Sequence, residues 1–443
     1  MKINIITLGC SKNTVDSENM AGHAEKAGHT VYFDREENDC DLVIVNTCGF
    51  INDAKEESVN TLVLQASAKR NFNRRHARDG RRRRLVAVGC LVERYRKELQ
   101  EEIPEVDAWY GAHQWQSIVE KECQHGRNPF TDEREVSTPH HYAYLKISEG
   151  CNRQCSYCAI PLIRGKHVSR PIDELVEEAK RLVSDGVKEL IVIAQDTTYY
   201  GVDLYGERRL GELLNRLAEE SGAQWIRLHY TYPSSFPEDA IEAIRRHPNI
   251  CKYIDIPLQH INSRILGSMQ RGIDREGTLR LLRRFRERIP DVSIRTTLIV
   301  GYPGETEQEF AELKEFVREA RFDRMGCFTY SPEEGTPAMA LGDTVSDDEK
   351  QRRRDELMDI QERISLENNE RRVGKTYKVL IDRREGDFYV GRTEFDSPEV
   401  DDEVLIDIEQ SKARNKKVSI GEFYQVCIVD AMENDLMGEI IDD

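Results

Sequence analysis

Three runs of mostly apolar residues lie in the first hundred positions of the chain, and each run ends on a cysteine. They read INIITLGC to Cys10, DLVIVNTC to Cys48 and RLVAVGC to Cys90. Unbroken Val, Ile and Leu are typical of strands buried on both faces of a parallel sheet. Successive cysteines are about 40 residues apart, which is long enough for a helical crossover between parallel strands. The pattern therefore predicts an N-terminal parallel α/β domain.

The polar stretches between these runs supply the helices. VDSENMAGHAEKAG and NDAKEESVNTLVLQASAK alternate apolar and charged residues in the way that amphipathic helices do. Asp16 and either Asn52 or Asp53 are the expected N-caps, because a short side-chain oxygen satisfies the free amides of the first turn.

The position of the three cysteines predicts a binding site. Ligands of open parallel sheets bind beyond the carboxyl ends of the strands. One cysteine at a strand end could be chance, but three in matching positions point to convergence on one edge. We therefore expect Cys10, Cys48 and Cys90 to form a site with three thiolates.

The segment from His140 to Pro332 alternates strand-like and helix-like patterns. Six apolar runs read as strands, with amphipathic stretches such as IDELVEEAKRLVSDG between them: YAYLKIS, ELIVIAQD, WIRLHYTYP, YIDIPLQ, SIRTTLIVG and MGCFTYSP. Six strand–helix units predict a barrel-like parallel sheet that stays open, because a full barrel needs eight.

Beyond Pro332 the chain no longer alternates strand-like and helix-like patterns. A charged helix is expected from about Ser346 to Arg372, followed by short strands with turn residues from Gly374 to Asp443. About 70 residues of this kind fit a small β-barrel. This segment carries 18 acidic residues against nine basic ones.

A second group of cysteines, in SEGCNRQCSYCAIPLIRGKHVSRP, directly follows the first strand of the predicted barrel. Cys151, Cys155 and Cys158 have the spacing C-x3-C-x2-C, and no further cysteine or histidine follows before His167. A cubane iron–sulfur cluster has four irons to ligate. Three thiolates therefore leave one iron open for a ligand that is not protein, as reactive metal sites do. The carboxyl-end face of the barrel is where such folds keep their chemistry.

This spacing resembles that of the radical SAM enzymes. The resemblance implies that S-adenosylmethionine (SAM) binds the open iron and that electron transfer into its sulfonium releases a carbon radical. It also places Tyr157 beside the adenine and Gln195, at the end of the second strand, in the surroundings of SAM. A polar cap on that strand is the alternative role for Gln195.

With two open cysteine triads, the whole chain resembles the methylthiotransferase family. The resemblance implies an N-terminal methylthiotransferase domain at 1–119, a linker at 120–136, a radical SAM core at 137–367 and a TRAM-type barrel at 368–443. It implies two [4Fe-4S] clusters, an auxiliary one on Cys10, Cys48 and Cys90 and a radical SAM one on Cys151, Cys155 and Cys158.

The family resemblance also implies the reaction. One SAM methylates a sulfur held on the auxiliary cluster, and a second SAM is cleaved to a 5′-deoxyadenosyl radical that takes hydrogen from the substrate. The substrate radical then captures the methylthio group, so both open irons must reach one substrate carbon. An external electron donor and a sulfur donor are expected.

Two branches of the family differ in substrate. The stretch LGCSKNTVDSE resembles the branch that reads Gly-Cys-x-Lys-Asn, through Ser11 and Lys12, whereas the transfer RNA branch of the MiaB type reads Gly-Cys-Gln-Met-Asn. The acidic C-terminal segment suits a basic protein rather than RNA phosphates. The ending DAMENDLMGEIID is similar to the first branch too. The resemblance thus implies methylthiolation of the β-carbon of an aspartate in small-subunit ribosomal protein twelve.

Two alternatives stay open at this point. A transfer RNA adenosine methylthiotransferase would use the basic residues of 69–84 for RNA contact. A non-enzymatic iron–sulfur or zinc protein with TRAM as an adaptor is the other, although it leaves the six-unit barrel without a role.

Net charge and composition further restrict the classes of protein to which the chain can belong. The formal net charge of −17 argues against a surface that binds nucleic acid throughout. Residues 69–84 are the exception, with nine Lys or Arg against one Asp, and we expect a solvated, mobile insertion there, with contact to ribosomal RNA as the weaker alternative. The longest apolar run, LIVIA, is far too short for a membrane span, and the N-terminus shows no signal region, so a cytoplasmic protein is expected.

The other five cysteines stand in unlike contexts and are expected to be small residues without chemistry, since cytosolic thiols are kept reduced. They are Cys40, Cys123, Cys251, Cys327 and Cys427.

Overall fold

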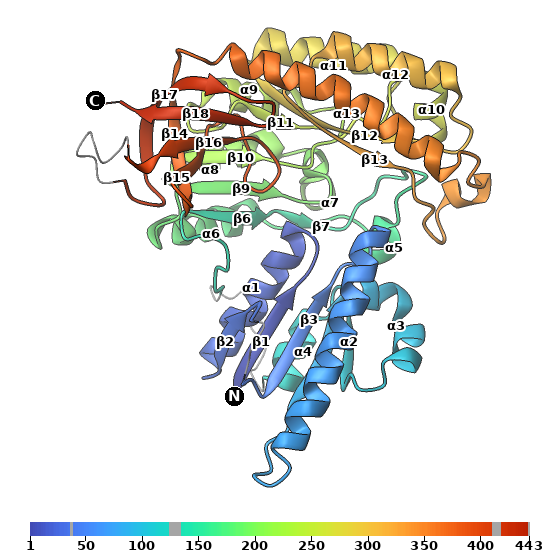
Figure 1. Cartoon of the computed structure of the whole chain (residues 1–443), viewed down its shortest axis with the longest axis vertical. Helices are drawn as coiled ribbons and strands as arrows, with labels where there is room; N and C mark the ends of the chain where they lie inside the picture. The colour runs from blue at the N-terminus through green and yellow to red at the C-terminus, as the bar shows by residue number, and fades with distance from the viewer. Residues whose placement is uncertain (36–38, 124–133, 410–417, 442–443) are drawn as a thin grey trace. The chain divides into compact units, whose positions relative to one another are not determined.

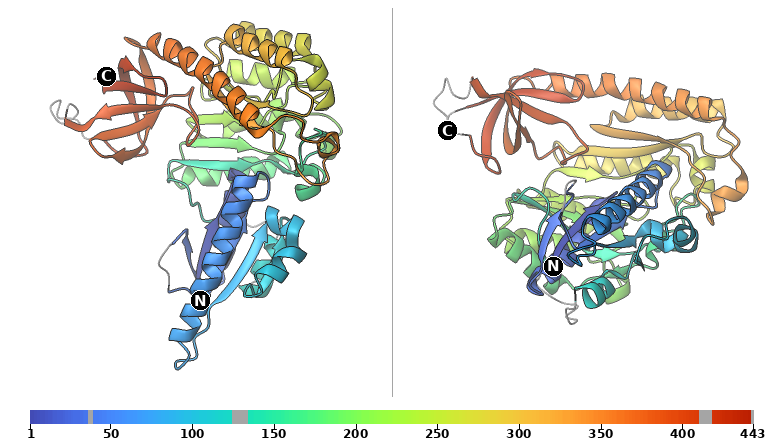
Figure 2. Two further views of the ribbon diagram at one scale, coloured as in Figure 1. Left: turned by 45° about the vertical axis from the view of Figure 1, so that its right-hand side comes forward. Right: turned by 60° about the horizontal axis from the view of Figure 1, so that its bottom comes forward.

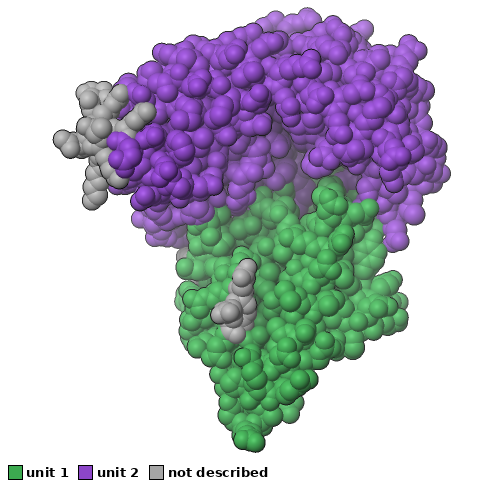
Figure 3. All heavy atoms as spheres, viewed as in Figure 1, with its two compact units in different colours: residues 1–138, 149–153, 159–167 green, residues 139–148, 154–158, 168–443 purple. Residues whose placement is uncertain are grey.

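The computed structural model describes residues 1–35, 39–123, 134–409 and 418–441, so the middle of the expected linker, 124–133, lies outside the described residues. The chain divides into two compact units, which Figure 3 colours separately. The first comprises residues 1–138, 149–153 and 159–167. The second comprises residues 139–148, 154–158 and 168–443.

The first unit is built on a five-stranded parallel sheet in the order β2-β1-β3-β4-β5. The three runs that end on cysteines form neighbouring strands of this sheet, as the apolar pattern predicted. The strands are β1 (Lys2–Thr7), β2 (Thr30–Phe33), β3 (Leu42–Thr47), β4 (Arg84–Gly89) and β5 (Ala108–Gly111).

Helices cover both faces of this sheet, which is why its strands β1, β3 and β4 are mostly apolar. Ile3, Ile44 and Val86 belong to the core cluster that contains residues of α1 and α4, whereas Val45 and Leu85 belong to the cluster that contains residues of α2 and α3. The helices are α1 (Ser11–Lys26), α2 (Asn52–Arg75), α3 (Cys90–Glu102) and α4 (Trp115–Glu122). In Figures 1 and 2 the last turns of α2 extend past the strands of this unit.

The expected N-caps of α1 and α2 are wrong. Cys10 stands at the N-cap of α1, so Asp16 lies inside the helix, where it is buried. Ile51 stands at the N-cap of α2, and Asn52 is already its first residue. Asp16 has a different partner, an arginine far along the chain, which is described below.

The second unit contains the six expected strands as parallel neighbours in two three-stranded groups, β10-β9-β6 and β11-β12-β13. A parallel bridge between Ile226 and Ile250 joins the two groups, which gives the open, six-stranded curved sheet that the pattern predicted. The strands are β6 (Tyr142–Lys146), β9 (Glu189–Ile193), β10 (Trp225–Leu228), β11 (Tyr253–Asp255), β12 (Ser293–Val300) and β13 (Arg324–Thr329).

Amphipathic helices alternate with these strands along the chain. The longer ones are α6 (Ile172–Ser184), α8 (Leu210–Glu220), α9 (Glu238–Arg246), α11 (Arg275–Arg288), α12 (Glu307–Ala320) and α13 (Asp347–Glu370). Shorter elements follow the strand ends: β7 (Ser148–Glu149), α5 (Ile160–Arg164), β8 (Val168–Ser169), η1 (Thr197–Tyr199), α7 (Val202–Tyr205), α10 (Ser263–Ser268) and η2 (Pro337–Leu341). The charged helix expected near 346–372 is α13, with Ser346 as its N-cap.

The C-terminal segment forms a closed barrel in the order β14-β15-β16-β18-β17, as its short strands predicted. Alternate strand residues such as Val379, Val404 and Val426 fill its interior. The strands are β14 (Thr376–Glu385), β15 (Phe388–Arg392), β16 (Glu403–Asp407), β17 (Phe423–Ala431) and β18 (Asp435–Ile440). Figure 2 shows α13 leading from the six-stranded sheet to this barrel.

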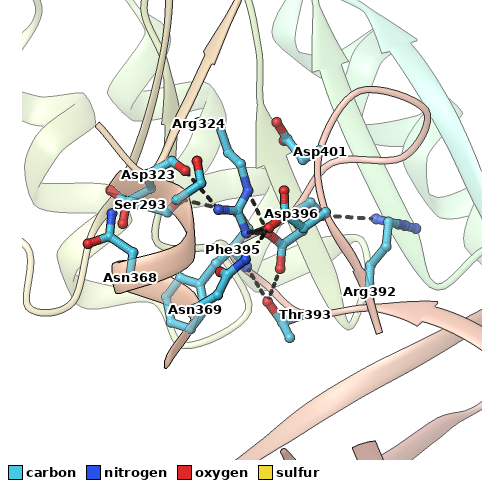
Figure 4. A network of polar contacts seen from close by, with 12 residues as sticks. Ser293, Asp323, Arg324, Asn368, Asn369, Arg392, Thr393, Phe395, Asp396 and Asp401 are labelled. Carbon is cyan, nitrogen blue, oxygen red and sulfur yellow. Dashed lines mark hydrogen bonds and ion pairs between the residues drawn. The ribbon is translucent and has the colours of Figure 1, made fainter. Parts of the chain in front are cut away.

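Buried ion pairs join the barrel to the six-stranded sheet (Figure 4). Arg324 of β13 lies 2.5 Å from Asp396 and 3.0 Å from Asp402, both in the connection between β15 and β16. Arg295 of β12 likewise pairs with Asp401 at 3.2 Å. These three acids therefore face arginines of the same unit and do not contribute to an acidic surface.

Among the described residues, no helix is both long and apolar enough to cross a membrane.

Candidate functional site

The first cysteine triad lies at the carboxyl ends of three adjacent strands. Cys48 directly follows β3, Cys90 directly follows β4 and opens α3, and Cys10 lies three residues beyond the end of β1. Cys48 and Cys90 are buried, and Cys10 is half-buried. The triad is therefore positioned by the sheet itself, which confirms that the strand pattern brings these residues to one edge.

The thiols are close enough to influence one another. Burial raises the pKa of Cys90 to about 12, and the charges of Cys10 and Cys48 act in the same direction. Burial and the charge of Cys10 also raise the pKa of Cys48. Three thiols at one sheet edge are a suitable donor set for a cationic iron centre, because a metal binds the thiolate and removes the proton even where burial raises the thiol pKa, as at Cys48 and Cys90.

A glycine flanks each of the three cysteines, and none of the three has room for a side chain. A Cβ on Gly9 would lie 2.6 Å from the Sγ of Cys48, and one on Gly49 would lie 2.8 Å from the backbone of Leu91. A Cβ on Gly89 would lie 2.5 Å from the carbonyl oxygen of Thr47. Neighbouring backbones at Gly49 and Gly89, and the Cys48 side chain at Gly9, thus approach so closely that only glycine fits.

Polar side chains tie the three strand ends together. Asn13, in the first turn of α1, donates to the carbonyl oxygens of Leu8 at 2.8 Å and Thr47 at 3.1 Å. Ser58 of α2 accepts from the backbone amide of Cys48 and donates to its carbonyl, both at 3.0 Å. The Asn13 side chain gives a structural reason for the asparagine in Gly-Cys-x-Lys-Asn, because it links β1 to β3 beside Cys10.

Sequence reasoning missed Arg164, which reaches this triad from the end of α5. Its Nε lies 3.3 Å from the Sγ of Cys90, and its Nη1 pairs with Asp16 at 2.8 Å and Glu149 at 3.1 Å. Burial alone would lower the pKa of Arg164, but Glu149 and Asp16 outweigh it and hold that pKa well above the ordinary arginine value. No local pattern marks this residue, which follows Cys158 by only a few positions.

The second cysteine group is divided between the two units. Cys151 belongs to the first unit, where its amide donates to the carbonyl oxygen of Gly165 at 3.0 Å. Cys155 and Cys158 belong to the second unit, where the Cys158 amide donates to the Cys155 carbonyl at 3.1 Å. The role of all six cysteines as cluster ligands stays a prediction.

Cys155 has polar partners that the sequence did not reveal. Nη1 of Arg271 lies 3.3 Å from its Sγ, and the hydroxyl of Tyr232 lies 3.4 Å from it. Arg271 is buried and also donates to the carbonyl of Pro257. Tyr232 and Pro257 come from TYPSS and PLQHINS, two stretches that follow strands of the six-stranded sheet at its carboxyl ends.

The two residues expected near SAM have unequal surroundings. Tyr157 packs against the apolar cluster of Ile265, Met269, Tyr302 and Tyr330, and its hydroxyl accepts a hydrogen bond from Arg271 at 3.3 Å. Burial raises its pKa above the ordinary tyrosine value. Gln195 lies two residues beyond β9 and is half-buried. Neither placement tests contact with SAM, so both roles stay predictions.

In the part of the chain that the structure describes, no three Cys, His, Asp or Glu side chains are grouped as the ligands of a single metal ion would be. A cluster makes a different demand, because each thiolate binds its own iron atom. The cysteine-only donor set, the close glycines and the nearby guanidinium fit such a cluster at Cys10, Cys48 and Cys90.

The basic segment 69–84 is not the insertion that its composition suggested. Residues 69–75 are the last turns of α2, and Arg84 opens β4. Five of its cations have partners within the unit: Lys69 with Asp107, Arg70 with Glu105, Arg81 with Asp39 and Asp41, Arg83 with the carbonyl of Cys40, and Arg84 with Glu122. Four exposed arginines have no ion pair among the described residues: Arg74, Arg75, Arg78 and Arg82.

The scattered cysteines are mostly buried, and their expected lack of chemistry stays a prediction. Cys40, Cys123, Cys251 and Cys327 are buried, and Cys427 is half-buried. Cys123 and Cys251 pack in hydrophobic clusters.

Family models match three parts of the chain. The Radical SAM superfamily matches residues 145–317, the uncharacterized protein family UPF0004 matches residues 2–111, and the TRAM domain matches residues 373–441.

Curated relatives match nearly the whole chain. The protein of Phocaeicola vulgatus named ribosomal protein uS12 methylthiotransferase RimO is 51% identical over 440 residues, which cover 99% of each chain. The relative of the same name in Bacteroides fragilis is 52% identical with the same coverage. That of Flavobacterium psychrophilum is 52% identical over 438 residues, which cover 99% of this chain and 98% of the relative.

Solved structures share the fold at low identity. The radical SAM methyltransferase TsrM of Kitasatospora setae, with cobalamin and a [4Fe-4S] cluster, aligns with a TM-score of 0.54 at 14% identity, over 76% of this chain and 73% of its own. The same enzyme with tryptophan and a SAM analogue aligns with a TM-score of 0.54 at 13% identity, over 87% and 79%.

Proposed function

The chain belongs to the RimO family of ribosomal protein uS12 methylthiotransferases, and from this premise we propose that it methylthiolates the β-carbon of an aspartate in uS12. Membership of the radical SAM superfamily implies a [4Fe-4S] cluster and SAM. The further proposal is that the chain holds two such clusters and uses two SAM molecules, one as methyl donor and one as radical source.

The observation that carries the proposal is the gathering of Cys10, Cys48 and Cys90 at the ends of adjacent strands. A radical SAM enzyme that only cleaves SAM needs one open cluster, which C-x3-C-x2-C supplies. Core packing explains single buried cysteines, but it does not explain three cysteines at the ends of adjacent strands that are each flanked by a glycine. A sulfur-bearing auxiliary cluster explains this arrangement.

When bound, the clusters and SAM supply the radical that removes hydrogen and the sulfur that is methylated and transferred. The residues of the chain supply the surroundings. Cys151, Cys155 and Cys158 hold one cluster and leave an iron for SAM, while Arg271 donates toward the thiolate of Cys155 and neutralises part of its charge. Tyr157 is enclosed by apolar side chains, so it excludes water from the side of the motif on which it lies.

The proposed protein partner is uS12, either free or in the ribosomal subunit, and an external electron donor and sulfur donor complete the reaction. RNA contact is proposed as secondary and is assigned to Arg74, Arg75, Arg78 and Arg82. These exposed cations, in the last turn of α2 and in the loop that follows it, are available to phosphates, whereas the other cations of the segment are paired internally.

The cluster proposal is tested by iron counting and SAM cleavage in two triple variants. The reconstituted chain should bind about eight irons. Changing Cys151, Cys155 and Cys158 to alanine should remove half of them and abolish 5′-deoxyadenosine formation. Changing Cys10, Cys48 and Cys90 should also remove half, yet keep SAM cleavage and stop methylthio transfer.

A Cys40→Ala, Cys427→Ala double variant is the matched control, because it removes thiols from neither triad and should keep the full iron content. If the variant of Cys10, Cys48 and Cys90 transfers sulfur at the parent rate, the auxiliary assignment is wrong.

The substrate proposal is tested by mass spectrometry of uS12 and of transfer RNA from a deletion strain and from the same strain with the gene restored. The deletion should remove one methylthio group from uS12 and leave transfer RNA unchanged. Loss of the modification from transfer RNA with uS12 intact would establish the alternative, an adenosine methylthiotransferase.

A further inference from the structure

Arg164 connects two parts of the protein that the proposed reaction requires to work together. It lies in the segment 159–167, which follows the last cysteine of C-x3-C-x2-C but belongs to the same compact unit as Cys10, Cys48 and Cys90. The side chain is 2% exposed, so its charge is compensated entirely by neighbours within the protein.

All three nitrogens of the Arg164 guanidinium have acceptors. Nη1 donates to Asp16 at 2.8 Å and to Glu149 at 3.1 Å, and Nη2 donates to Oδ1 of Asn13 at 2.5 Å. Nε is directed at the Sγ of Cys90, 3.3 Å away. Nη1 of the guanidinium thus pairs with two carboxylates, while the Nε–H points to the thiol of Cys90, a proposed cluster ligand.

The backbone next to Arg164 contacts the other cysteine group. The carbonyl oxygen of Gly165 accepts the amide of Cys151 at 3.0 Å, and a Cβ on Gly150 would collide with the carbonyl oxygens of Arg164 and Lys166. Two consecutive residues, 164 and 165, therefore hold the Cys90 thiol with a side chain and the Cys151 backbone with a carbonyl.

We propose that Arg164 is a positioning residue for the auxiliary cluster, which it orients through Cys90 and whose reduction it favours. The inference rests on the proposed function, because it takes Cys90 as a cluster ligand. The physical basis is that hydrogen bonds to ligating sulfurs and positive charge near a cluster both stabilise its reduced, more negative form.

A purely structural role is the competing explanation. In that case Arg164 only neutralises Asp16 and Glu149 and fastens α5 to α1, and its loss lowers stability without altering the cluster. The two explanations differ in one measurable quantity, the midpoint potential of the auxiliary cluster.

The experiment uses the full chain in which Cys151, Cys155 and Cys158 are alanine, so that only the auxiliary cluster is present. Iron content and the midpoint potential, from a redox titration followed by absorbance and electron paramagnetic resonance, are measured for three variants in this background. Arg164→Gln removes both charge and the N–H···S bond, Arg164→Lys keeps the charge, and Lys166→Gln removes an exposed charge two residues away.

Arg164→Gln should move the midpoint to a more negative potential, Arg164→Lys should move it less in the same direction, and Lys166→Gln should leave it unchanged. Asp16→Asn should move it to a more positive potential, because it removes a buried negative charge beside the guanidinium. This last variant keeps the inference testable where Arg164→Gln does not fold.

The possible results distinguish a failure of the proposed function from a failure of the role proposed for Arg164. If the parent background binds no iron, the auxiliary site itself fails, and with it the proposed function. If it binds iron and the Arg164 and Asp16 variants titrate at the parent potential, Arg164 is structural and the inference is overturned.

Discussion

Asp402 offers a direct test of how buried charge joins the C-terminal barrel to the six-stranded sheet. It lies immediately before β16, and its Oδ2 accepts from Nδ2 of Asn369 at 2.6 Å and lies 3.0 Å from Nη2 of Arg324. The same guanidinium is shared with Asp396 at 2.5 Å (Figure 4). One arginine therefore faces two buried carboxylates, and the second can ionise only at a cost.

The magnitude follows from the pKa of Asp402. Burial raises this pKa from 3.8 to about 6 in spite of the attraction of Arg324, and the charge of Asp396 raises it as well. Because the folded-state pKa is raised, the stability that this group contributes is fully present below about pH 4 and is lost as the pH rises through about 6. A shift of about two pKa units corresponds to about 3 kcal/mol as an upper bound.

Asp402→Asn should therefore stabilise the protein at high pH. Asparagine resembles the protonated carboxyl and can still accept from Asn369 and Arg324. We expect a gain in the free energy of unfolding of about 1 to 3 kcal/mol at pH 8, and about half of that gain at pH 5, which already lies above the unfolded pKa of 3.8. The removal of a carboxylate that pairs with an arginine would then increase stability.

Scanning calorimetry of the cluster-free chain between pH 5 and pH 8 provides the measurement. The quantity compared is the difference in unfolding temperature between variant and parent at each pH, because a chain with several domains need not unfold in two states. Asp359→Asn, an exposed carboxylate of α13, is the control and should show no pH-dependent difference. A difference for Asp402→Asn that stays constant with pH, or that becomes destabilising toward pH 8, would refute the reasoning.

Two further predictions concern glycine contacts and buried charge. Gly9→Ala should lower iron binding at the first triad, because the added Cβ would overlap Cys48. Gly28 has a similar positive φ but open space around it, so Gly28→Ala should keep the iron and serves as the control. Iron counting compares the two variants. Glu189→Gln should destabilise the second unit by about 3 to 5 kcal/mol, since it leaves two buried arginines without their shared carboxylate. Thermal unfolding measures this, and Glu220→Gln, which removes only surface ion pairs with Arg216 and Lys180, serves as control, with a far smaller change expected.

The strands were predictable because burial on both faces requires a run of consecutive, mostly apolar residues. The three strands β1, β3 and β4 are covered on both faces, so the chain is mostly apolar along each run, and the cysteine that follows marks the sheet edge. The six strands of the second unit follow the same logic. Register and strand order within the sheets required the structure, because several orders satisfy the same apolar pattern.

The helix caps and the charged partners were not predictable, because their partners lie far away in the sequence. Asp16 has the residue type of an N-cap, but its carboxylate neutralises Arg164, which is 148 positions away. The excess of acids in the C-terminal segment similarly overstated its surface charge, since Asp396, Asp401 and Asp402 face arginines of β12 and β13. A count of charges cannot distinguish an exposed acid from one that folding has already paired.

The glycines beside the cysteines carry information that the cysteine spacing alone does not. Gly49 and Gly89 each admit a neighbouring backbone, and Gly9 admits the side chain of Cys48, so close packing at the strand ends fixes where the thiols lie. A cysteine that served only to fill a core would need side-chain neighbours and no such glycine. A crowded glycine therefore separates the two kinds of buried cysteine in this chain, because Cys40, Cys123, Cys251 and Cys427 have no adjacent glycine, and Gly326 beside Cys327 has nothing within 4 Å of its Cβ position. This leads us to expect that substitutions at the three glycines impair the first triad as severely as substitutions of its cysteines, although none of the glycines could bind a metal itself.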